Sequence, residues 1–227
     1  MNASNSRDRQ FSNFCHTLGV LCGAVLLGTI GTSLGRPSSS GYPAPERYRL
    51  DASDSKFIAH ALRGGLLWFK GHDHLVAASQ FSGEAEITPD SIAPASLRLV
   101  VKTESMRETN SLFTEQQKQI IDKELREIVL LPAKYPEIVF QSTDVKGKSL
   151  GNGQYELKIG GDLTLNGVTR RIVIPAQVTL MGNDLRARGK FSVDRSDYKV
   201  KATSAVHGLI RVRNKIKFTF DIVGHKY

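Results

Sequence analysis

The residues best suited to bind a metal or a polar ligand are the two histidines in the run Gly71-His72-Asp73-His74. In an extended strand, side chains two residues apart project to the same side, about 6 to 7 Å apart along the backbone. This spacing suits a pair of metal ligands, but a tetrahedral zinc site needs three or four. Three further histidines lie beyond the first 35 residues, with no paired spacing: His60, His207 and His225. The pair therefore predicts a metal site, a polar contact for a ligand headgroup, or a structural hydrogen-bonding role.

Nucleophilic catalysis has no supporting pattern in this sequence. The chain has no Gly-x-Ser-x-Gly elbow, and His72 and Asp73 would project to opposite faces of a strand. The two cysteines, Cys15 and Cys22, both lie in an apolar N-terminal segment. Glycine loops of the kind that bind phosphate are missing from the sequence as well. We therefore expect a protein that is not an enzyme and needs no cofactor.

Residues 1–35 have the pattern of a signal peptide. The stretch 18–30 is apolar apart from glycine and threonine, follows Arg7 and Arg9, and precedes small residues at the spacing that a signal peptidase reads. The longer stretch 14–34 is sufficient to span a bilayer, so an uncleaved anchor is the alternative. We expect a periplasmic or extracellular protein, held at the membrane if the leader is retained.

The rest of the chain divides into a short linker and one domain. Residues 36–45 are rich in proline, serine and glycine, which predicts a flexible linker. Residues 46–227 are enough to bury a core without disulfides. The net charge is +9, but the basic residues alternate along predicted strands without an aromatic platform, so we expect no nucleic-acid partner. A peripheral contact with anionic lipid headgroups and an ordinary solvated surface are the remaining explanations.

Alternation of apolar and polar residues predicts strands with one buried face over 155–165, 172–180, 185–193 and 210–222. Asn166-Gly167, between the first two, suits a two-residue type I′ turn, which needs positive φ at both positions. Less regular patterns predict six further strands, over 46–51, 56–62, 66–70, 74–87, 95–104 and 136–146.

One helix is predicted over 115–131, where Ile121, Leu125 and Ile128 recur at helical spacing. Thr114 and Gln117 have the spacing of a capping box at its start, and Pro132 ends it. Many long strands with short turns and a single helix favour an all-β fold, an antiparallel barrel of about eight strands, because closure removes exposed sheet edges. The interior of such a barrel is either filled by side chains or open to one small ligand.

The run Leu66-Leu67-Trp68-Phe69 is continuously apolar and ends at Lys70. Core packing is the simplest interpretation of such a run. The alternative places Trp68 at the mouth of a cavity, with its indole N–H on a headgroup and its ring on an apolar chain.

The segment 160–170, which reads G-G-D-L-T-L-N-G-V-T-R, closely resembles the signature of the YceI-like family of lipocalin-like, polyisoprenoid-binding proteins. Blocks at 48–51, 81–84, 134–143 and 195–198 are similar to the family in the same order, and together they cover 46 to about 223. Two features differ from the common pattern. The family's D-x-x-H-S has aspartate at position 54 here, and the G-H-D-H run over 71–74 is similar to the form in one branch of the family.

The resemblance implies an antiparallel barrel with an amphiphile inside, in an exported, non-catalytic carrier. We expect the partner to be a long-chain isoprenoid or other amphiphilic lipid, such as a polyprenyl or quinone lipid. His72 and His74 are the expected polar contacts, and the expected wall residues are Phe57, Trp68, Phe81, Leu99, Phe140, Leu165, Phe191 and Phe218. Two alternatives remain: a metal-binding or pH-responsive stress protein that uses the histidine pair, and a filled barrel that acts as an interaction module. The oligomeric state is not predicted.

Overall fold

The structure is a computed structural model that describes residues 43–205, 207 and 209–227. The predicted leader over 1–35 lies outside the described residues, as does most of the predicted linker. Within the described part, no helix combines the length and the apolar character needed to cross a membrane.

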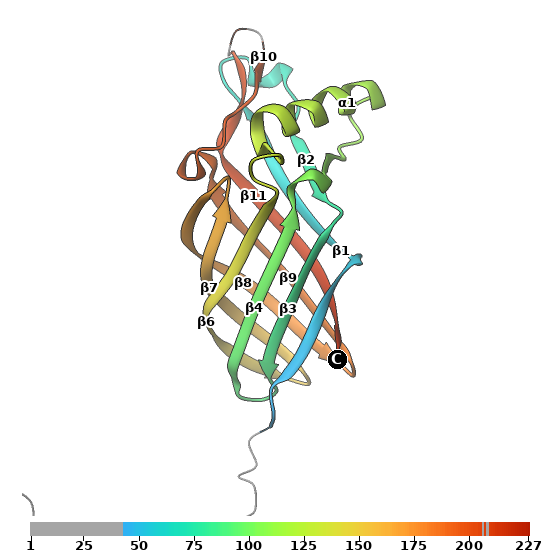
Figure 1. Cartoon of the computed structure of the whole chain (residues 1–227), viewed down its shortest axis with the longest axis vertical. Helices are drawn as coiled ribbons and strands as arrows, with labels where there is room; N and C mark the ends of the chain where they lie inside the picture. The colour runs from blue at the N-terminus through green and yellow to red at the C-terminus, as the bar shows by residue number, and fades with distance from the viewer. Residues whose placement is uncertain (1–42, 206, 208) are drawn as a thin grey trace, which may run out of the picture. The chain divides into compact units, whose positions relative to one another are not determined.

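The described chain folds into a closed barrel of eight antiparallel strands with one 16-residue helical segment, as predicted (Figure 1). Strand β1 pairs with β11 along most of its length, from Tyr48 opposite Lys226 to Gly64 opposite Arg211, and this pairing closes the sheet. In sheet order the barrel strands are β1 (Glu46–Gly64), β3 (Phe81–Thr88), β4 (Ile92–Lys102), β6 (Glu137–Gly151), β7 (Gln154–Leu165), β8 (Val168–Met181), β9 (Asp184–Asp194) and β11 (Ile210–Lys226).

Three shorter strands extend one end of the barrel: β2 (His74–Ala78), β5 (Met106–Glu108) and β10 (Ser204–Ala205). β2 pairs with the second half of β1, over residues 58–61, whereas β3 pairs with its first residues, 46–49. The strand predicted over 74–87 is therefore two strands. Ser79 and Gln80 separate them because Gln80 bonds with Ser105 and Lys102, not with β1.

The strands predicted over 46–51 and 56–62 are one strand, β1, with a bulge between Asp51 and Lys56. The strand predicted over 66–70 is wrong. Gly65, with φ of +90°, ends the extended backbone, and the chain turns into a short 3₁₀ helix, η1 (Trp68–Lys70). Core packing is also wrong there, since Leu66, Trp68 and Phe69 are 76%, 49% and 61% exposed.

The hairpin between β7 and β8 has the predicted turn. Asn166 and Gly167 have φ of +52° and +72°, the positive values that a type I′ turn requires. The Asn166 side chain donates to the carbonyls of Tyr198 and Lys199, both at 3.2 Å, which ties the hairpin to the connection after β9. Along β7 the predicted inward side chains are buried, namely Tyr155, Leu157, Ile159, Leu163 and Leu165.

The helix begins at the predicted capping box, with both Thr114–Gln117 hydrogen bonds formed. It is α-helical over α1 (Glu115–Glu124) and continues as a π-helix, η3 (Leu125–Leu130), to Leu131, whose backbone is left-handed. A π-turn has more residues per turn than an α-turn, so it changes which side chains face inward. Ile128, predicted on the apolar face, is therefore 40% exposed, whereas Leu130 is buried.

An arginine–aspartate cluster lies on the outer face of the paired strands β9 and β11. Arg186 donates twice to Asp221, at 2.7 Å in each case, and Arg188 donates to the same carboxylate at 3.1 Å. The hydrogen bonds from Arg186 are the main reason that the pKa of Asp221 falls to about 2. The pairing joins β9 to β11 beside the closing seam.

We expect Asp221→Asn to lower the free energy of unfolding at neutral pH by about 1 kcal/mol, since the pair is charged and bidentate but partly solvated. Because the folded pKa lies below its usual value, this stabilisation is present above about pH 5 and is lost as the pH falls toward about 2. Urea unfolding of both proteins across that range measures the effect. Asp162→Asn, which removes a single hydrogen bond from Arg171, is the control with the smaller loss. A pH-independent difference for Asp221→Asn would contradict the prediction.

Candidate functional site: the barrel cavity

The interior of the barrel holds an apolar cavity of about 240 Å³. A water molecule needs only about 10–15 Å³ of such space, so the cavity has room for a molecule much larger than water. Side chains from all eight barrel strands, β2, β5 and the helix line it. The barrel is therefore not filled by its own residues.

Small residues keep the lumen open. Alanines at several inward positions of β1, β3, β4, β8 and β9 line the cavity: Ala59, Ala85, Ala95, Ala176 and Ala187. Two glycines make room for large rings that line the cavity. A Cβ at Gly161 would come within 2.6 Å of the Phe140 ring, and one at Gly189 would collide with the Phe220 ring. A Cβ at either position would also collide with a backbone carbonyl, Gln141 O at 2.5 Å or Pro175 O at a shorter distance, so both the rings and the strand pairing require glycine there.

Six of the eight predicted wall residues line the cavity: Phe57, Leu99, Phe140, Leu165, Phe191 and Phe218. Phe191 and Phe218 stack with ring centroids 4.8 Å apart, and Phe57 lies 5.8 Å from Phe218, so three strands contribute one aromatic wall. Phe81 is not a lining residue. It is buried in a neighbouring core cluster with Leu50, Val101 and Ile222, among others.

Trp68 lies outside the set of cavity-lining residues and is about half exposed, next to Phe69 on the connection from β1 to β2. His74 does line the cavity, whereas His72 lines an adjoining pocket at the same end. The structure thus separates the predicted site residues into a cavity wall, a core residue, an exposed tryptophan and two histidines near the mouth.

The helix covers one end of the cavity, a role that the sequence analysis did not assign to it. Ile121, Leu125, Val129 and Leu130 all line the cavity. Helical periodicity identified the first two, but the π-turn brings in the last two in place of Ile128. Figure 1 shows the helix beside β2 at the end of the barrel opposite the C-terminus.

A second pocket, of about 280 Å³, adjoins the cavity at this end, and we call it the vestibule. The two share five lining residues: His74, Ile121, Glu124, Thr203 and Val212. The vestibule is more polar than the cavity, since Arg63, His72 and Arg211 also line it. It is the polar mouth of an apolar lumen, an arrangement that suits an amphiphile.

The two histidines flank the ring of Phe113 and do not form a matched pair. His74 stacks on this ring at 5.3 Å and His72 meets it edge-on at 5.7 Å. His74 Nδ1 donates to Glu108 at 2.8 Å, so one of its nitrogens is already engaged. Within residues 43–205, 207 and 209–227, neither histidine belongs to a group of three potential metal ligands whose donor atoms lie within 4.8 Å of one another.

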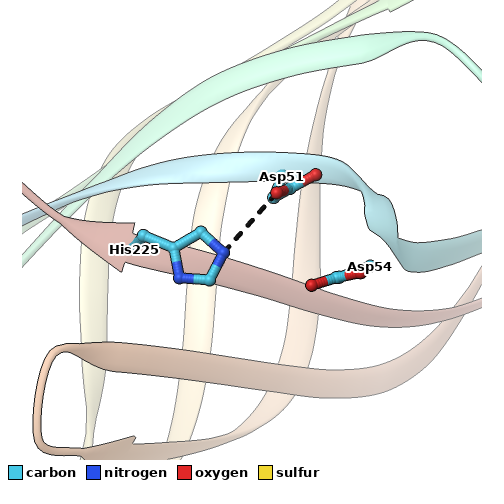
Figure 2. A group of neighbouring side chains, drawn as sticks. All are labelled: Asp51, Asp54 and His225. Atoms are coloured by element: carbon cyan, nitrogen blue, oxygen red, sulfur yellow. Dashed lines mark ion pairs between the residues drawn. The ribbon is translucent and has the colours of Figure 1, made fainter.

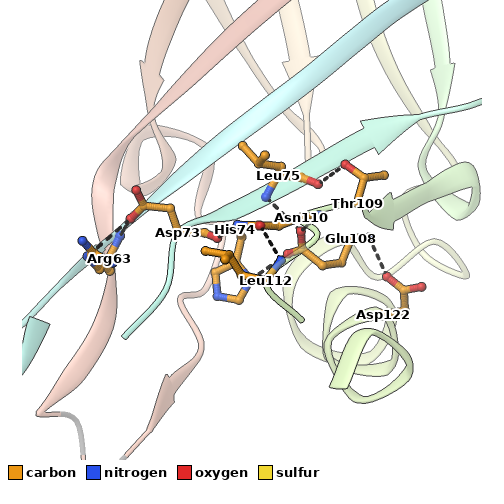
Figure 3. A network of polar contacts seen from close by, with 9 residues as sticks. All are labelled: Arg63, Asp73, His74, Leu75, Glu108, Thr109, Asn110, Leu112 and Asp122. Atoms are coloured by element: carbon orange, nitrogen blue, oxygen red, sulfur yellow. Dashed lines mark hydrogen bonds and ion pairs between the residues drawn. The ribbon is translucent and has the colours of Figure 1, made fainter. Parts of the chain in front are cut away.

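Glu108 is the buried centre of a polar network at the mouth (Figure 3). Its side chain is inaccessible to solvent and accepts hydrogen bonds from His74, from Leu75 N and from Asn110 N. Burial alone would raise the pKa of Glu108, but these hydrogen bonds outweigh it and leave the pKa lowered. Sequence reasoning missed this residue, because a single glutamate in a three-residue strand gives no periodic signal.

The network also reaches the helix. Glu108 N donates to Asp122 Oδ1 at 2.8 Å, and Asn110 Nδ2 donates to Asp73 O at 2.7 Å. The Glu108 carboxylate therefore joins β5 to β2, and the Asp122 carboxylate joins β5 to α1.

A group of three potential metal ligands lies toward the opposite end of β1, at the bulge (Figure 2). It consists of Asp51, Asp54 and His225, all partly or fully exposed. His225 Nδ1 donates to Asp184 at 2.8 Å, and this bond and the nearby aspartates raise the pKa of His225. Exposed acidic groups of this kind are common without a bound ion, so we assign no ligand to this group.

Similarity to known proteins supports this description of the fold. A UPF0312 protein of Vibrio cholerae is 39% identical over 107 residues, which are 47% of this chain and 50% of that protein. A UPF0312 protein of Yersinia enterocolitica is 28% identical over 163 residues, 70% of this chain and 74% of that protein. The chain thus spans about half the length of the Vibrio relative and about three quarters of the Yersinia one.

Two solved structures share the fold at low sequence identity. BcnA of Burkholderia cenocepacia has a TM-score of 0.60 at 17% identity, covering 77% of this chain and 98% of that one. A polyisoprenoid-binding domain from Saccharophagus degradans, described as implicated in plant cell wall breakdown, has a TM-score of 0.56 at 14% identity, covering 79% and 98%. The model of the YceI-like domain family matches residues 48–224, most of the described barrel. The chain therefore belongs to the YceI-like domain family.

Proposed function

We propose that this protein binds a long-chain amphiphilic lipid inside its barrel and carries it without covalent chemistry. The observation that supports this most directly is the apolar cavity with a polar mouth. An isoprenoid chain, as in a polyprenyl or quinone lipid, is apolar along its length and so matches the apolar lining of the lumen. The Saccharophagus neighbour is named as a polyisoprenoid-binding domain, which supports the same class of ligand.

The energetics favour a long chain. Burying one CH₂ group contributes about 0.8 kcal/mol, so ten carbons contribute about 8 kcal/mol. Association costs about 4–15 kcal/mol in lost freedom and ordering. A short acyl chain would therefore bind weakly, whereas a longer one would bind with useful affinity. The aromatic wall of Phe57, Phe191 and Phe218 adds contact area along such a chain.

A carrier of this kind is useful where a lipid must cross water between membranes. We therefore also propose that the protein works in the periplasm or outside the cell, in agreement with the leader predicted for residues 1–35. A filled barrel acting only as an interaction module is not favoured, because the lumen is open.

The helix and the Glu108 network support a gated mouth in this proposal. The helix contributes lining residues at the covered end, and the network joins it to β2 and β5. A ligand as long as the lumen would have to pass these elements to enter or leave.

The direct test of the proposal is native mass spectrometry of the gently purified protein, followed by solvent extraction and lipid analysis. We expect a long-chain lipid at near one-to-one stoichiometry. Ala176→Phe would place a ring in the lumen and should reduce the bound lipid at least about tenfold, since it removes much of the buried contact. Val173→Phe, on the exposed face of the same strand, is the matched control and should leave lipid content unchanged. Wild-type protein recovered empty, or equal lipid in both variants, would refute the proposal.

Glu108→Gln keeps the shape of the side chain but directs an amide group at donors that need an acceptor. We expect amide hydrogen exchange in 74–78 and 106–108 to be about tenfold faster or more, since a buried hydrogen bond to a charged group is lost. In the wild type the same segments should loosen as the pH falls below the usual glutamate pKa of about 4.3, because the stabilisation from a carboxyl with a lowered pKa is complete above its unfolded pKa and is lost as the pH falls through the folded one. Glu104→Gln, at an exposed position, is the control. Unchanged exchange in these segments would show that the network does not hold the mouth.

A further inference from the structure

The exposed apolar residues of the run 66–69 have no role in the cavity, yet they lie at its mouth. Leu66 and Phe69 are mostly solvent-exposed, Trp68 is about half exposed, and Leu209, on the connection into β11, is 39% exposed. Leu67 N donates to Leu209 O at 2.9 Å, so the two connections lie side by side. We call Leu66, Trp68, Phe69 and Leu209 the mouth patch. Contiguous exposed apolar patches mark interaction surfaces, whereas single exposed apolar residues are normal.

The mouth patch borders the vestibule directly. Arg63 lines the vestibule, and its guanidinium lies over the Trp68 ring at 5.6 Å from the centroid. β1 ends one residue after Arg63, at Gly64, which pairs with Arg211 of the vestibule wall. A surface that contacts the patch therefore also faces the entrance to the cavity.

Basic side chains surround the patch. Lys70 ends η1, and Arg211 and Arg213 extend outward from the start of β11, all three exposed. Arg213 Nε donates to Arg63 O at 3.0 Å, which places it beside the same strand end. Two acidic groups lie nearby: Asp73, 3.9 Å from Arg63, and Glu124 of the helix. The positive groups outnumber them, in keeping with the net charge of +9.

This combination matches the boundary of an anionic membrane. Tryptophan and phenylalanine favour the headgroup level, and lysine and arginine beside them attract anionic lipids at about 1 kcal/mol each. A protein partner would also bury apolar residues, but it would have no reason to lie against the mouth of a lipid cavity. A bilayer is the source from which the lipid must come.

We infer that the mouth patch docks the barrel on an anionic membrane surface, so that a lipid chain passes from the bilayer through the vestibule into the cavity. Leu66, Trp68, Phe69 and Leu209 enter the headgroup region, and Lys70, Arg211 and Arg213 contact the anionic headgroups. This inference rests on the proposed function, because it supplies the route by which the carrier is loaded.

Trp68 is the only tryptophan of the chain, so its fluorescence reports on the patch alone. The full chain is mixed with phosphatidylcholine vesicles that contain either no phosphatidylglycerol or about 30 mol % of it. We expect a blue shift of the emission and quenching by brominated acyl chains with the anionic vesicles, both reduced by high salt. Contact made only by the predicted leader would bring the chain to the vesicles without changing Trp68.

Matched variants separate the apolar and charged contributions. Phe69→Asp should weaken vesicle binding at least about tenfold, whereas Met181→Asp, at an equally exposed apolar residue remote from the mouth, should not. Lys70→Gln with Arg211→Gln should weaken it about 30-fold, from two charges lost at the surface. Lys158→Gln with Lys190→Gln removes the same charge from exposed positions on β7 and β9 and should have little effect.

Unchanged Trp68 emission with anionic vesicles overturns the inference, even where the chain floats with them. Equal binding to neutral vesicles overturns the assignment of anionic lipid. Equal loss in the mouth and control variants shows that the surface is not specific. The lipid content of the purified protein is measured separately, so a barrel that holds lipid but does not dock refutes this inference alone.

Discussion

The pairing of β1 with β11 is the constraint on which the rest of the structure depends. It joins residues as far apart in sequence as Tyr48 and Lys226, and without it the sheet would have two long free edges. Closure fixes the register of every strand, so the inward set of each strand is determined together with that of its neighbours. The cavity follows from this register, because alanines then line the lumen and glycines fall where the rings of Phe140 and Phe220 need space.

The sequence predicted the parts of this fold that follow from local periodicity. The alternation along β7, β8, β9 and β11 gave the correct inward faces, and Asn166-Gly167 gave the correct turn. These features depend on two-residue periods and on the φ preferences of individual residues. The capping box at Thr114 is local in the same way, and it formed as predicted.

Features that depend on distant contacts were not predictable. The apolar run 66–69 was expected in the core, but Gly65 turns it away from β1 and leaves Leu66, Trp68 and Phe69 exposed. The buried position of Glu108 depends on donors from His74, Leu75 and Asn110, which only the fold brings together. The open lumen itself depends on which residues of eight strands meet inside the barrel, a question that no single strand answers.

The π-turn at the end of the helix has a consequence for how this family of sites can diversify. A turn of this kind arises when one residue is added to an α-helix, and the addition rotates every side chain that follows. In η3 it exchanges Ile128 for Val129 and Leu130 at the cavity. Barrel strands take up extra residues only at bulges, such as the one in β1 between Asp51 and Lys56, since a slip of one position elsewhere would turn each wall inside out. Single insertions or deletions in the helix can therefore change which side chains contact a bound ligand, while the barrel strands keep their register.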